Sequence, residues 1–184
     1  EQVIAQDPGN LEAYQNLALI LTAAEAHDRA LAVLDRALSA MPNNPMVLVN
    51  RGGVLHSKGD LPGAFETYER AIEVAPEDPQ VHRALGFMAV GVGSLSVARS
   101  AWERTIDLNG ADLEVRNALG QLYVSVGEEA SGIEQFEAIV AREPRAALPR
   151  HTLGFLYRGA GRLDEAKQQF LLCIQSEPGW TEPH

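Results

Sequence analysis

The sequence has a single cysteine, Cys173, so an internal disulfide framework is excluded. Its cysteine and histidine residues show no spacing typical of a zinc site, and no metal or cofactor is predicted. No apolar run approaches the length of a transmembrane helix, which predicts a chain that does not insert into a membrane.

Basic residues are also scarce, because 15 lysines and arginines stand against 25 aspartates and glutamates, a formal net charge of −10. Nucleic acid requires a basic face, and anionic membrane surfaces attract basic segments. Both classes of partner are therefore disfavoured. We interpret the acidity as a source of solubility. The compartment stays unknown at this point, with a soluble, cytoplasmic chain as the favoured expectation.

What the sequence does have is a repeat with a constant step of 34 residues. From Gly52 the step reaches Ala18 behind it and Gly86, Gly120 and Gly154 ahead. From Pro76 it reaches Pro8, Pro42, Gly110, Pro144 and Pro178. A fixed period of this length indicates a repeat array in which each unit contacts only its neighbours.

Each period carries two apolar stripes with helical spacing, separated by turn residues. The first stripe predicts a helix over residues 11–23, and the second predicts a helix over residues 28–40 that Pro42 ends. In the next period Asp60 is expected to cap the second helix, with Pro62 tolerated in its first turn. The pattern predicts an all-α array of antiparallel helix pairs.

The step also divides the chain into repeats. The predicted divisions are the end of a preceding repeat helix and its turn at 1–10, repeats at 11–44, 45–78, 79–112, 113–146 and 147–180, and the truncated start of a further repeat at 181–184. Because the chain begins within a repeat, we expect its natural N-terminus to lie upstream, so the lack of a targeting segment at Glu1 carries little weight.

Small residues recur in both helices of every pair. The first helices carry Ala18, Gly52, Gly86, Gly120 and Gly154, and the second carry Ala30, Ala64, Ala98, Gly132 and Ala166. Glycine costs about 1 kcal/mol relative to alanine inside a helix, so four glycines in one column indicate a steric need. We expect the two small columns to face each other, with Leu34, Tyr68, Trp102, Phe136 and Phe170 filling the space between adjacent pairs.

This pattern resembles the tetratricopeptide repeat family over essentially the whole chain. The clearest repeat carries the signature residues Leu153, Gly154, Tyr157, Gly161, Ala166, Phe170 and Pro178. The resemblance implies a right-handed α-solenoid, a superhelix of helix pairs whose first helices line a concave groove. It also implies binding, without identifying what is bound.

Several residues depart from the family pattern. Glu25 replaces the turn glycine of the first repeat, and His82, Arg116 and Arg150 occupy a column that is usually bulky and apolar. The lysines with which some members clamp the carboxylate of a chaperone tail are missing from the corresponding places. We therefore reject that assignment.

Catalysis requires a nucleophile, a base and an orienting group in one pocket. The histidines fall in different columns, and no Ser/His/Asp arrangement or phosphate loop is present. The glycines around Gly52 and Gly91 are explained by packing and turns. The sequence thus predicts a protein that is not an enzyme.

Apolar and amide side chains recur on the exposed face of the first helices, where they predict a binding groove for a protein or peptide. The predicted partner-binding residues are Gln15, Asn16, Leu19, Met46, Val49, Asn50, His56, Gln80, Arg83, Phe87, Val90, Asn117, Gln121, Val124, His151, Phe155 and Arg158. Apolar residues of this kind indicate a partner, and side-chain amides can pair with a peptide backbone. Gly53 leaves a gap in the column of Phe87 and Phe155, a place for a bulky partner side chain.

These residues also have structural interpretations. Phe87 and Phe155 could pack on a neighbouring helix, and Arg83 and Arg158 could either be solvated or hold a carboxylate. Cys173 is expected to be a small buried apolar residue.

Three functions remain open at this stage. The first is a protein-interaction scaffold that binds a partner peptide or helix in the groove. The second is self-assembly as a homo-oligomer through open repeat ends, at Val3 and Ile4 and around Ile174. The third is a targeting or regulatory segment of a larger parent protein that could itself be an enzyme.

Overall fold

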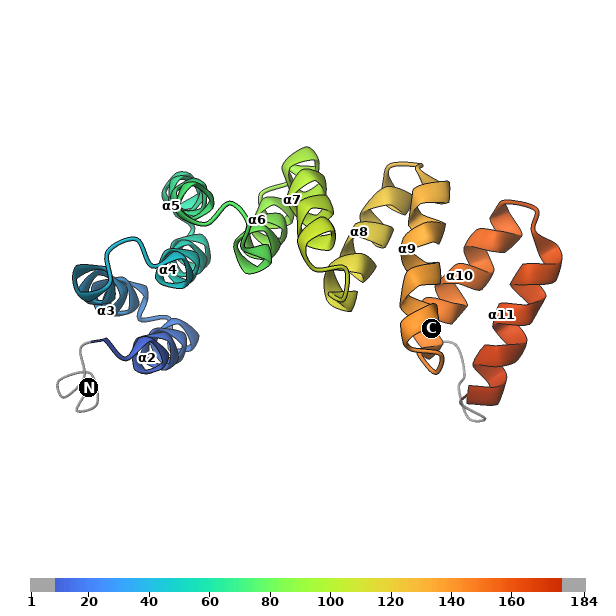
Figure 1. Cartoon of the computed structure of the whole chain (residues 1–184), viewed down its shortest axis with the longest axis horizontal. Coiled ribbons are helices and arrows are strands. Elements are labelled where there is room, and N and C mark those ends of the chain that lie inside the picture. The colour runs from blue at the N-terminus through green and yellow to red at the C-terminus, as the bar shows by residue number, and fades with distance from the viewer. Residues whose placement is uncertain (1–8, 177–184) are drawn as a thin grey trace. The chain divides into compact units, whose positions relative to one another are not determined.

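The computed structural model describes residues 9–176, which contain helices and no strand (Figure 1). The helices are α2 (Leu11–Ala23), α3 (His27–Ala40), α4 (Pro45–Lys58), α5 (Leu61–Val74), α6 (Pro79–Gly91), α7 (Leu95–Leu108), α8 (Leu113–Ser125), α9 (Glu129–Arg142), α10 (Ala147–Gly159) and α11 (Leu163–Ser176). The predicted all-α array of helix pairs is confirmed. Residues 1–8 and 177–184 lie outside the described residues, and with them Val3, Ile4, Pro178, most of the predicted segment at 1–10 and the predicted start of a further repeat at 181–184.

The chain forms two compact units, unit 1 (residues 1–108) and unit 2 (residues 109–184). In unit 1, α4 packs against its partner α5 and also contacts α2, α3 and α6. The first helices α2, α4 and α6 thus lie next to one another, with α3, α5 and α7 on their other side (Figure 1). In unit 2, α8 pairs with α9, α10 pairs with α11, and α9 contacts α10.

Side chains just outside the helices hold their first turns in place. The Asn44 side chain accepts hydrogen bonds from the backbone amides of Met46 and Val47, directly before Pro45 at the start of α4. Asp60 accepts a hydrogen bond from the Gly63 amide at the start of α5, as predicted. Each cap satisfies amide groups that have no partner within their helix.

The turn inside each pair needs one residue in the left-handed backbone region. Glycine occupies it in four pairs, at Gly59, Gly93, Gly127 and Gly161, where φ lies between +76° and +87°. In the first pair Glu25 adopts the same conformation with φ of 57°. A residue with a Cβ atom is strained there, so the missing glycine of the first repeat has a cost in stability.

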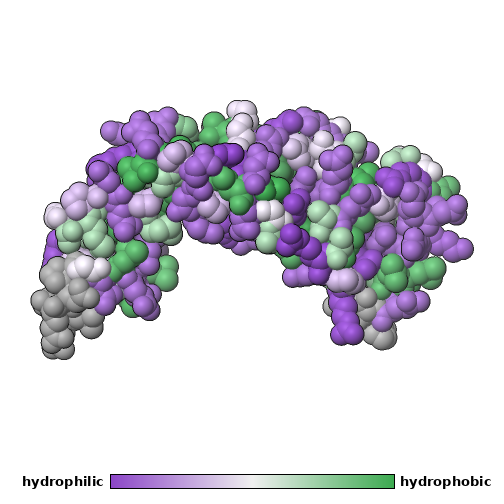
Figure 2. All heavy atoms as spheres, viewed as in Figure 1, coloured by the Kyte–Doolittle hydropathy of each residue, from purple (hydrophilic) through white to green (hydrophobic). Residues whose placement is uncertain are grey.

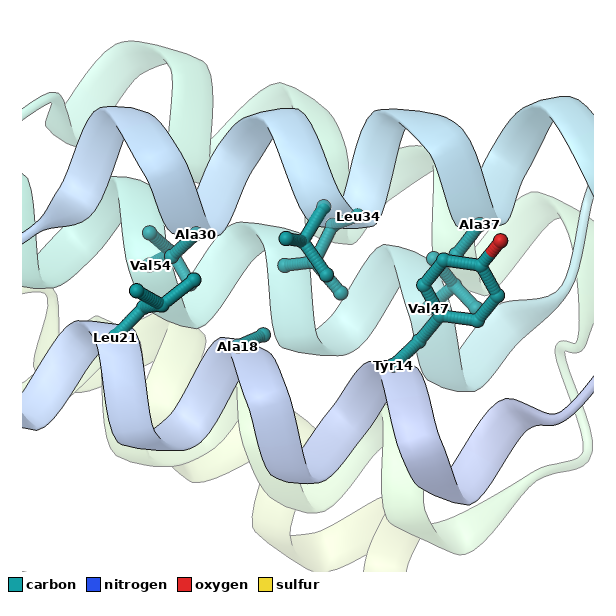
Figure 3. Close-up of a cluster of buried hydrophobic side chains, with 9 residues drawn as sticks. Tyr14, Ala18, Leu21, Ala30, Leu34, Ala37, Val47 and Val54 are labelled. Carbon is teal, nitrogen blue, oxygen red and sulfur yellow. The ribbon is translucent and has the colours of Figure 1, made fainter. Parts of the chain in front are cut away.

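The core of the first pair lies between α2, α3 and α4 (Figure 3). Tyr14 and Ala18 on α2 face Leu34 and Ala37 on α3, and Val47 on α4 closes the cluster. All five are nearly or fully buried. Small side chains at Ala18 and Ala37 let the backbones approach while Leu34 fills the space between them.

The glycine column has a different main neighbour from the one predicted. We expected it to face the small column, with the large residues between adjacent pairs. A Cβ atom added to Gly86 would lie 2.3 Å from Cδ1 and Nε1 of Trp102, on the second helix of the same pair. Gly52, Gly120 and Gly154 meet Tyr68, Phe136 and Phe170 in the same way. The steric need thus comes mainly from the ring within the pair.

In one pair the small residue of the second helix also contributes to the steric need for glycine. A Cβ atom on Gly132 would lie 3.2 Å from the Gly120 carbonyl oxygen, so these two glycines do oppose each other. It would also lie 2.7 Å from Cγ2 of Val124. The predicted close approach of the two helices is therefore present there, alongside the contact with the ring.

His82, Arg116 and Arg150, the polar residues in the apolar column, reach back to the preceding loop. His82 Nε2 lies 2.8 Å from the Pro76 carbonyl oxygen. Arg116 donates through Nε to the Gly110 carbonyl, and Arg150 donates through Nε to the Pro144 carbonyl. In all three cases the acceptor lies six residues earlier, so the contact recurs in three repeats and ties α6, α8 and α10 to the loop before each helix.

Cys173 is buried, as predicted, and its thiol contacts the Ala147 carbonyl oxygen at 3.5 Å. Within residues 9–176 no helix is both long enough and apolar enough to cross a membrane.

Candidate functional site

A hollow of about 320 Å³ opens between α2 and α4 in unit 1. Its lining residues are Gln15, Ala18, Leu19, Thr22, Val49, Asn50, Gly53, Val54, Ser57 and Tyr68. Over unit 1, apolar side chains (green) reach the surface between hydrophilic ones (purple) in Figure 2. The hollow combines both kinds of side chain on one small concave surface.

Gly53 is the reason that the hollow exists. A Cβ atom built on Gly53 would meet a single neighbouring side-chain atom within 4 Å, the Tyr68 hydroxyl oxygen at 3.7 Å. The space above the glycine is therefore open, with the buried ring of Tyr68 below it. Leu19 stands at the edge with 69% of its surface exposed.

The polar groups around the hollow differ in their availability. The Thr22 hydroxyl donates to the Ala18 carbonyl of its own helix at 2.8 Å. The Asn50 side-chain nitrogen is buried and has no hydrogen-bond partner. An unsatisfied buried donor costs about 1–3 kcal/mol, so a ligand acceptor that reached it would be favoured.

The hollow carries no formal charge, since none of its lining residues is acidic or basic. Burial raises the pKa of Tyr68 to about 12. Its hydroxyl thus remains protonated at neutral pH and can donate a hydrogen bond.

Predicted residues on α6 form a second part of the same surface. The guanidinium carbon of Arg83 lies 5.1 Å from the centre of the Phe87 ring. Phe87 in turn meets Trp102 with ring centres 5.1 Å apart and planes at 66°. Phe87 is half-buried, Val90 is 42% exposed, and Gln80 is exposed.

We define the first-helix face of unit 1 by the predicted residues that these helices carry towards the surface. They are Gln15, Leu19, Val49, Asn50, Gln80, Arg83, Phe87 and Val90, together with Gly53. Apolar and amide side chains alternate there with a single cation, Arg83.

Three predicted residues of α2 and α4 lie away from the hollow lining. Asn16 is exposed, and Met46 is half-buried at the start of α4. His56 packs on the next first helix, because a Cβ atom on Gly91 would lie 2.7 Å from its Nε2 atom. Of the neighbours expected around Gly53, only Val49 belongs to the lining.

In unit 2 the predicted residues of α10 form an aromatic cluster. Phe155 lies 4.6 Å from His151 and 5.3 Å from Phe170, measured between ring centres. The guanidinium of Arg158 lies 4.5 Å from the Phe155 ring centre. These contacts within one helix pair hold the ring of Phe155 in place, with a cation on it.

The predicted residues of α8 are less concentrated. Gln121 is exposed and Asn117 is half-buried. Val124 packs against Gly132 of α9 and joins the core, so much of its surface is used within the pair.

The sequence did not identify Tyr68 as part of the site, because its column is that of the core. Ser57 was also missed. One signal was available, since the 34-residue step aligns Gly53 with Phe87 and Tyr68 with Trp102. Where the first column lacks a side chain, the residue of the second column lines the hollow that is left, as Tyr68 does here.

No candidate metal centre emerges from the part of the chain that the structure describes. Within it, no three histidine, cysteine, aspartate or glutamate side chains converge in a way that could hold a metal ion. The site is thus defined by shape and by uncharged polar groups.

Family models described as tetratricopeptide repeat match residues 1–48, 21–86 and 150–179. A curated human protein, "Protein O-mannosyl-transferase TMTC1", is 34% identical over 70 residues, which is 36% of this chain. The chain spans only 8% of the length of that relative.

Solved structures show the same fold at low identity. The crystal structure of MamA has a TM-score of 0.74 and 22% identity, and the match covers 94% of this chain and 97% of that one. YrrB, described as a TPR protein with an unusual peptide-binding site, has a TM-score of 0.70 and 23% identity, with 97% and 92% covered. Together with the family models, these matches establish that the chain belongs to the tetratricopeptide repeat family.

Proposed function

We propose that this chain is a protein-interaction scaffold and that the first-helix face of unit 1 binds a peptide segment of a partner protein. The observation that carries the proposal is the uncharged hollow between α2 and α4, which joins apolar walls to an amide donor without a partner. A peptide offers matching groups, namely apolar side chains and backbone carbonyls. The peptide-binding site described for YrrB supports the same use of this fold.

The energy of binding would come mainly from apolar contact. Leu19, Val49 and Val90 are each at least partly exposed on this face, and burying such a side chain fully contributes about 1.5–3 kcal/mol. Asn50 and Gln15 would fix the register of the peptide by hydrogen bonds to its backbone. The acidic net charge of the chain supports a protein partner in preference to nucleic acid.

The test is a selection of peptides from a random displayed library, followed by affinity measurement with a matched pair of variants. Leu19→Glu places a charge at the edge of the hollow. Ile20→Glu places the same charge on the same helix at a residue that is 65% exposed, close to the 69% of Leu19, and does not line the hollow. We expect Leu19→Glu to weaken peptide binding at least tenfold and Ile20→Glu to leave it within twofold.

Two results would contradict the proposal. One is that no peptide is selected by the folded chain. The other is that both glutamate variants bind the selected peptides as tightly as the wild type. Circular dichroism of both variants confirms that each retains its helices.

Self-assembly is a second candidate function, favoured by exposed apolar residues on α11. Leu171 is 49% exposed and Ile174 is 62% exposed. Two copies that covered these residues would form a homo-oligomer. Sedimentation velocity over a hundredfold range of concentration should then show association that Ile174→Glu abolishes, whereas a monomer throughout would contradict it.

The local match to the human transferase favours a third candidate, a non-catalytic repeat segment of a larger enzyme. In that case the chain by itself binds partners and transfers no mannose from an activated donor. Measurable transfer by the isolated chain would contradict this assignment.

A further inference from the structure

The 34-residue step aligns one position of the first helices, Leu19, Gly53, Phe87, Gln121 and Phe155, with one large residue of the second helices, Leu34, Tyr68, Trp102, Phe136 and Phe170. In the third repeat Phe87 covers Trp102, with ring centres 5.1 Å apart. In the fifth repeat Phe155 covers Phe170, with ring centres 5.3 Å apart. In the second repeat Gly53 takes the place of the phenylalanine.

Both ring pairs have the same geometry. Their planes meet at 66° and 81°, so each phenylalanine presents an edge-to-face contact to the ring of the second helix. Such pairs contribute about 0.5–1.5 kcal/mol beyond the burial of their area. In the second repeat the corresponding ring is that of Tyr68, and the hollow lies where the phenylalanine would stand.

The size and charge of the hollow limit what can fill it. Its volume of about 320 Å³ is at the lower end of ligand pockets, which span about 300–1,000 Å³. It therefore suits one large side chain better than a cofactor. Its lining has no charged group, so a buried lysine, arginine, aspartate or glutamate would have no counter-ion there.

We infer that the hollow over Gly53 is a pocket for one aromatic side chain of the bound peptide, which takes the place that Phe87 and Phe155 take in their repeats and meets Tyr68 at its hydroxyl edge. This inference rests on the proposed function and specifies its anchor residue. The chain supplies Tyr68, and the peptide supplies the aromatic side chain that Phe87 and Phe155 provide in their repeats. Asn50 lines the same pocket, and its buried side-chain nitrogen has no hydrogen-bond partner within the described residues.

The structure provides a variant that fills the pocket from within. A Cβ atom on Gly53 meets Tyr68 at an ordinary contact distance of 3.7 Å, so a side chain can be added without a clash at its base. Gly53→Phe copies the residue that the third and fifth repeats carry. Gly53→Ala is the matched control, since it makes the same change of backbone freedom and leaves most of the hollow open.

The experiment has two parts. In the first, N-acetyl-phenylalanine amide, N-acetyl-leucine amide and N-acetyl-alanine amide are titrated into the ¹⁵N-labelled chain, and shifts of the Gly53 and Tyr68 amide signals are recorded. We expect the phenylalanine probe to shift these signals with an affinity at least fivefold above that of the leucine probe, and the alanine probe to have no effect. Gly53→Phe should abolish the response, and Gly53→Ala should retain it.

In the second part, peptides selected on the wild-type chain are measured against the same variants. We expect them to contain an aromatic residue whose replacement by alanine weakens binding at least tenfold, and Gly53→Phe to produce a similar loss. Peptides that bind wild type and Gly53→Phe equally would overturn the aromatic pocket while leaving peptide binding intact. Equal response to the leucine and phenylalanine probes would also overturn it. Failure to select any peptide would instead overturn the proposed function, and this inference with it.

Discussion

The contact between glycine and aromatic ring in each helix pair makes a quantitative prediction about stability. A Cβ atom would lie 2.3 Å from Trp102 at Gly86, 2.7 Å from Phe170 at Gly154 and 3.1 Å from Phe136 at Gly120. Ordinary carbon contacts lie at about 3.5–4.0 Å, so the overlap decreases along this series. The substitution Gly→Ala should therefore be most harmful at Gly86.

The expected magnitudes follow from two opposing effects. Replacing a helical glycine by alanine stabilises a helix by about 1 kcal/mol, whereas overpacking a core costs about 1–3 kcal/mol. Trp102 is 3% exposed and has little room to move. We expect Gly86→Ala to lower the free energy of unfolding by about 2 kcal/mol and Gly120→Ala to change it by less than about 0.5 kcal/mol, with Gly154→Ala between them.

A second substitution tests the cause. In the first repeat the equivalent pair is Ala18 and Leu34, which pack without a clash in a buried cluster. The double variant Gly86→Ala, Trp102→Leu copies that pair, so its stability should exceed the sum of the two single effects by about 1–2 kcal/mol, within the range known for residues in contact.

Urea unfolding monitored by circular dichroism at 222 nm measures these free energies, and an unchanged dependence on urea shows that the variants unfold in the same way. A Gly86→Ala variant as stable as the wild type would refute the reasoning. So would equal losses at Gly86, Gly154 and Gly120, or additive effects in the double variant.

Three further predictions concern other features of the fold. Glu25→Gly should stabilise the chain by about 0.5–1 kcal/mol in urea unfolding, because it relieves a left-handed residue with φ of 57°, and Gly59→Ala should destabilise it; the reverse order would contradict this account. Arg150→Ala should cost about 2–3 kcal/mol in the same assay, because it leaves the Pro144 carbonyl and Gln169 without their donor and also empties a buried site. Arg150→Leu loses the same donor but fills the site with apolar volume, as Leu48 does in the second repeat, so it should cost less; equal losses would contradict this account. Burial raises the pKa of Tyr68 from 10.0 to about 12, so the stability that its protonated hydroxyl contributes is fully present below pH 10 and is lost as the pH rises towards 12. Tyr68→Phe should therefore reduce the alkaline loss of the free energy of unfolding by about 2–3 kcal/mol. Identical pH profiles of stability for the two proteins would contradict this.

The repeat made most of the fold predictable from the sequence. The helix predicted over residues 11–23 matches α2, and the second predicted helix differs only in beginning at His27 instead of Asp28. Asp60 caps α5 as expected. Such features depend on local sequence, which a fixed period repeats in every unit.

Contacts between helices were less predictable, because the period shows which residues are equivalent but not what each one touches. The period aligned the glycines of the first helices, but it did not show that aromatic side chains of the second helix in the same pair contact them. It marked Arg116 and Arg150 as departures, yet their bonds to loop carbonyls depend on where the preceding loop lies in space. The gap at Gly53 was visible in the alignment of repeats. The position of Tyr68 beneath it was not, because it depends on how α4 packs on α5.

The central claim is that partner peptides bind the first-helix face of unit 1, and chemical-shift mapping with a selected peptide tests it most directly. The account predicts that the largest amide shifts cluster on α2, α4 and α6, centred on Gly53 and including Leu19 and Val49. Shifts confined to α3, α5 and α7, or to unit 2, would contradict it.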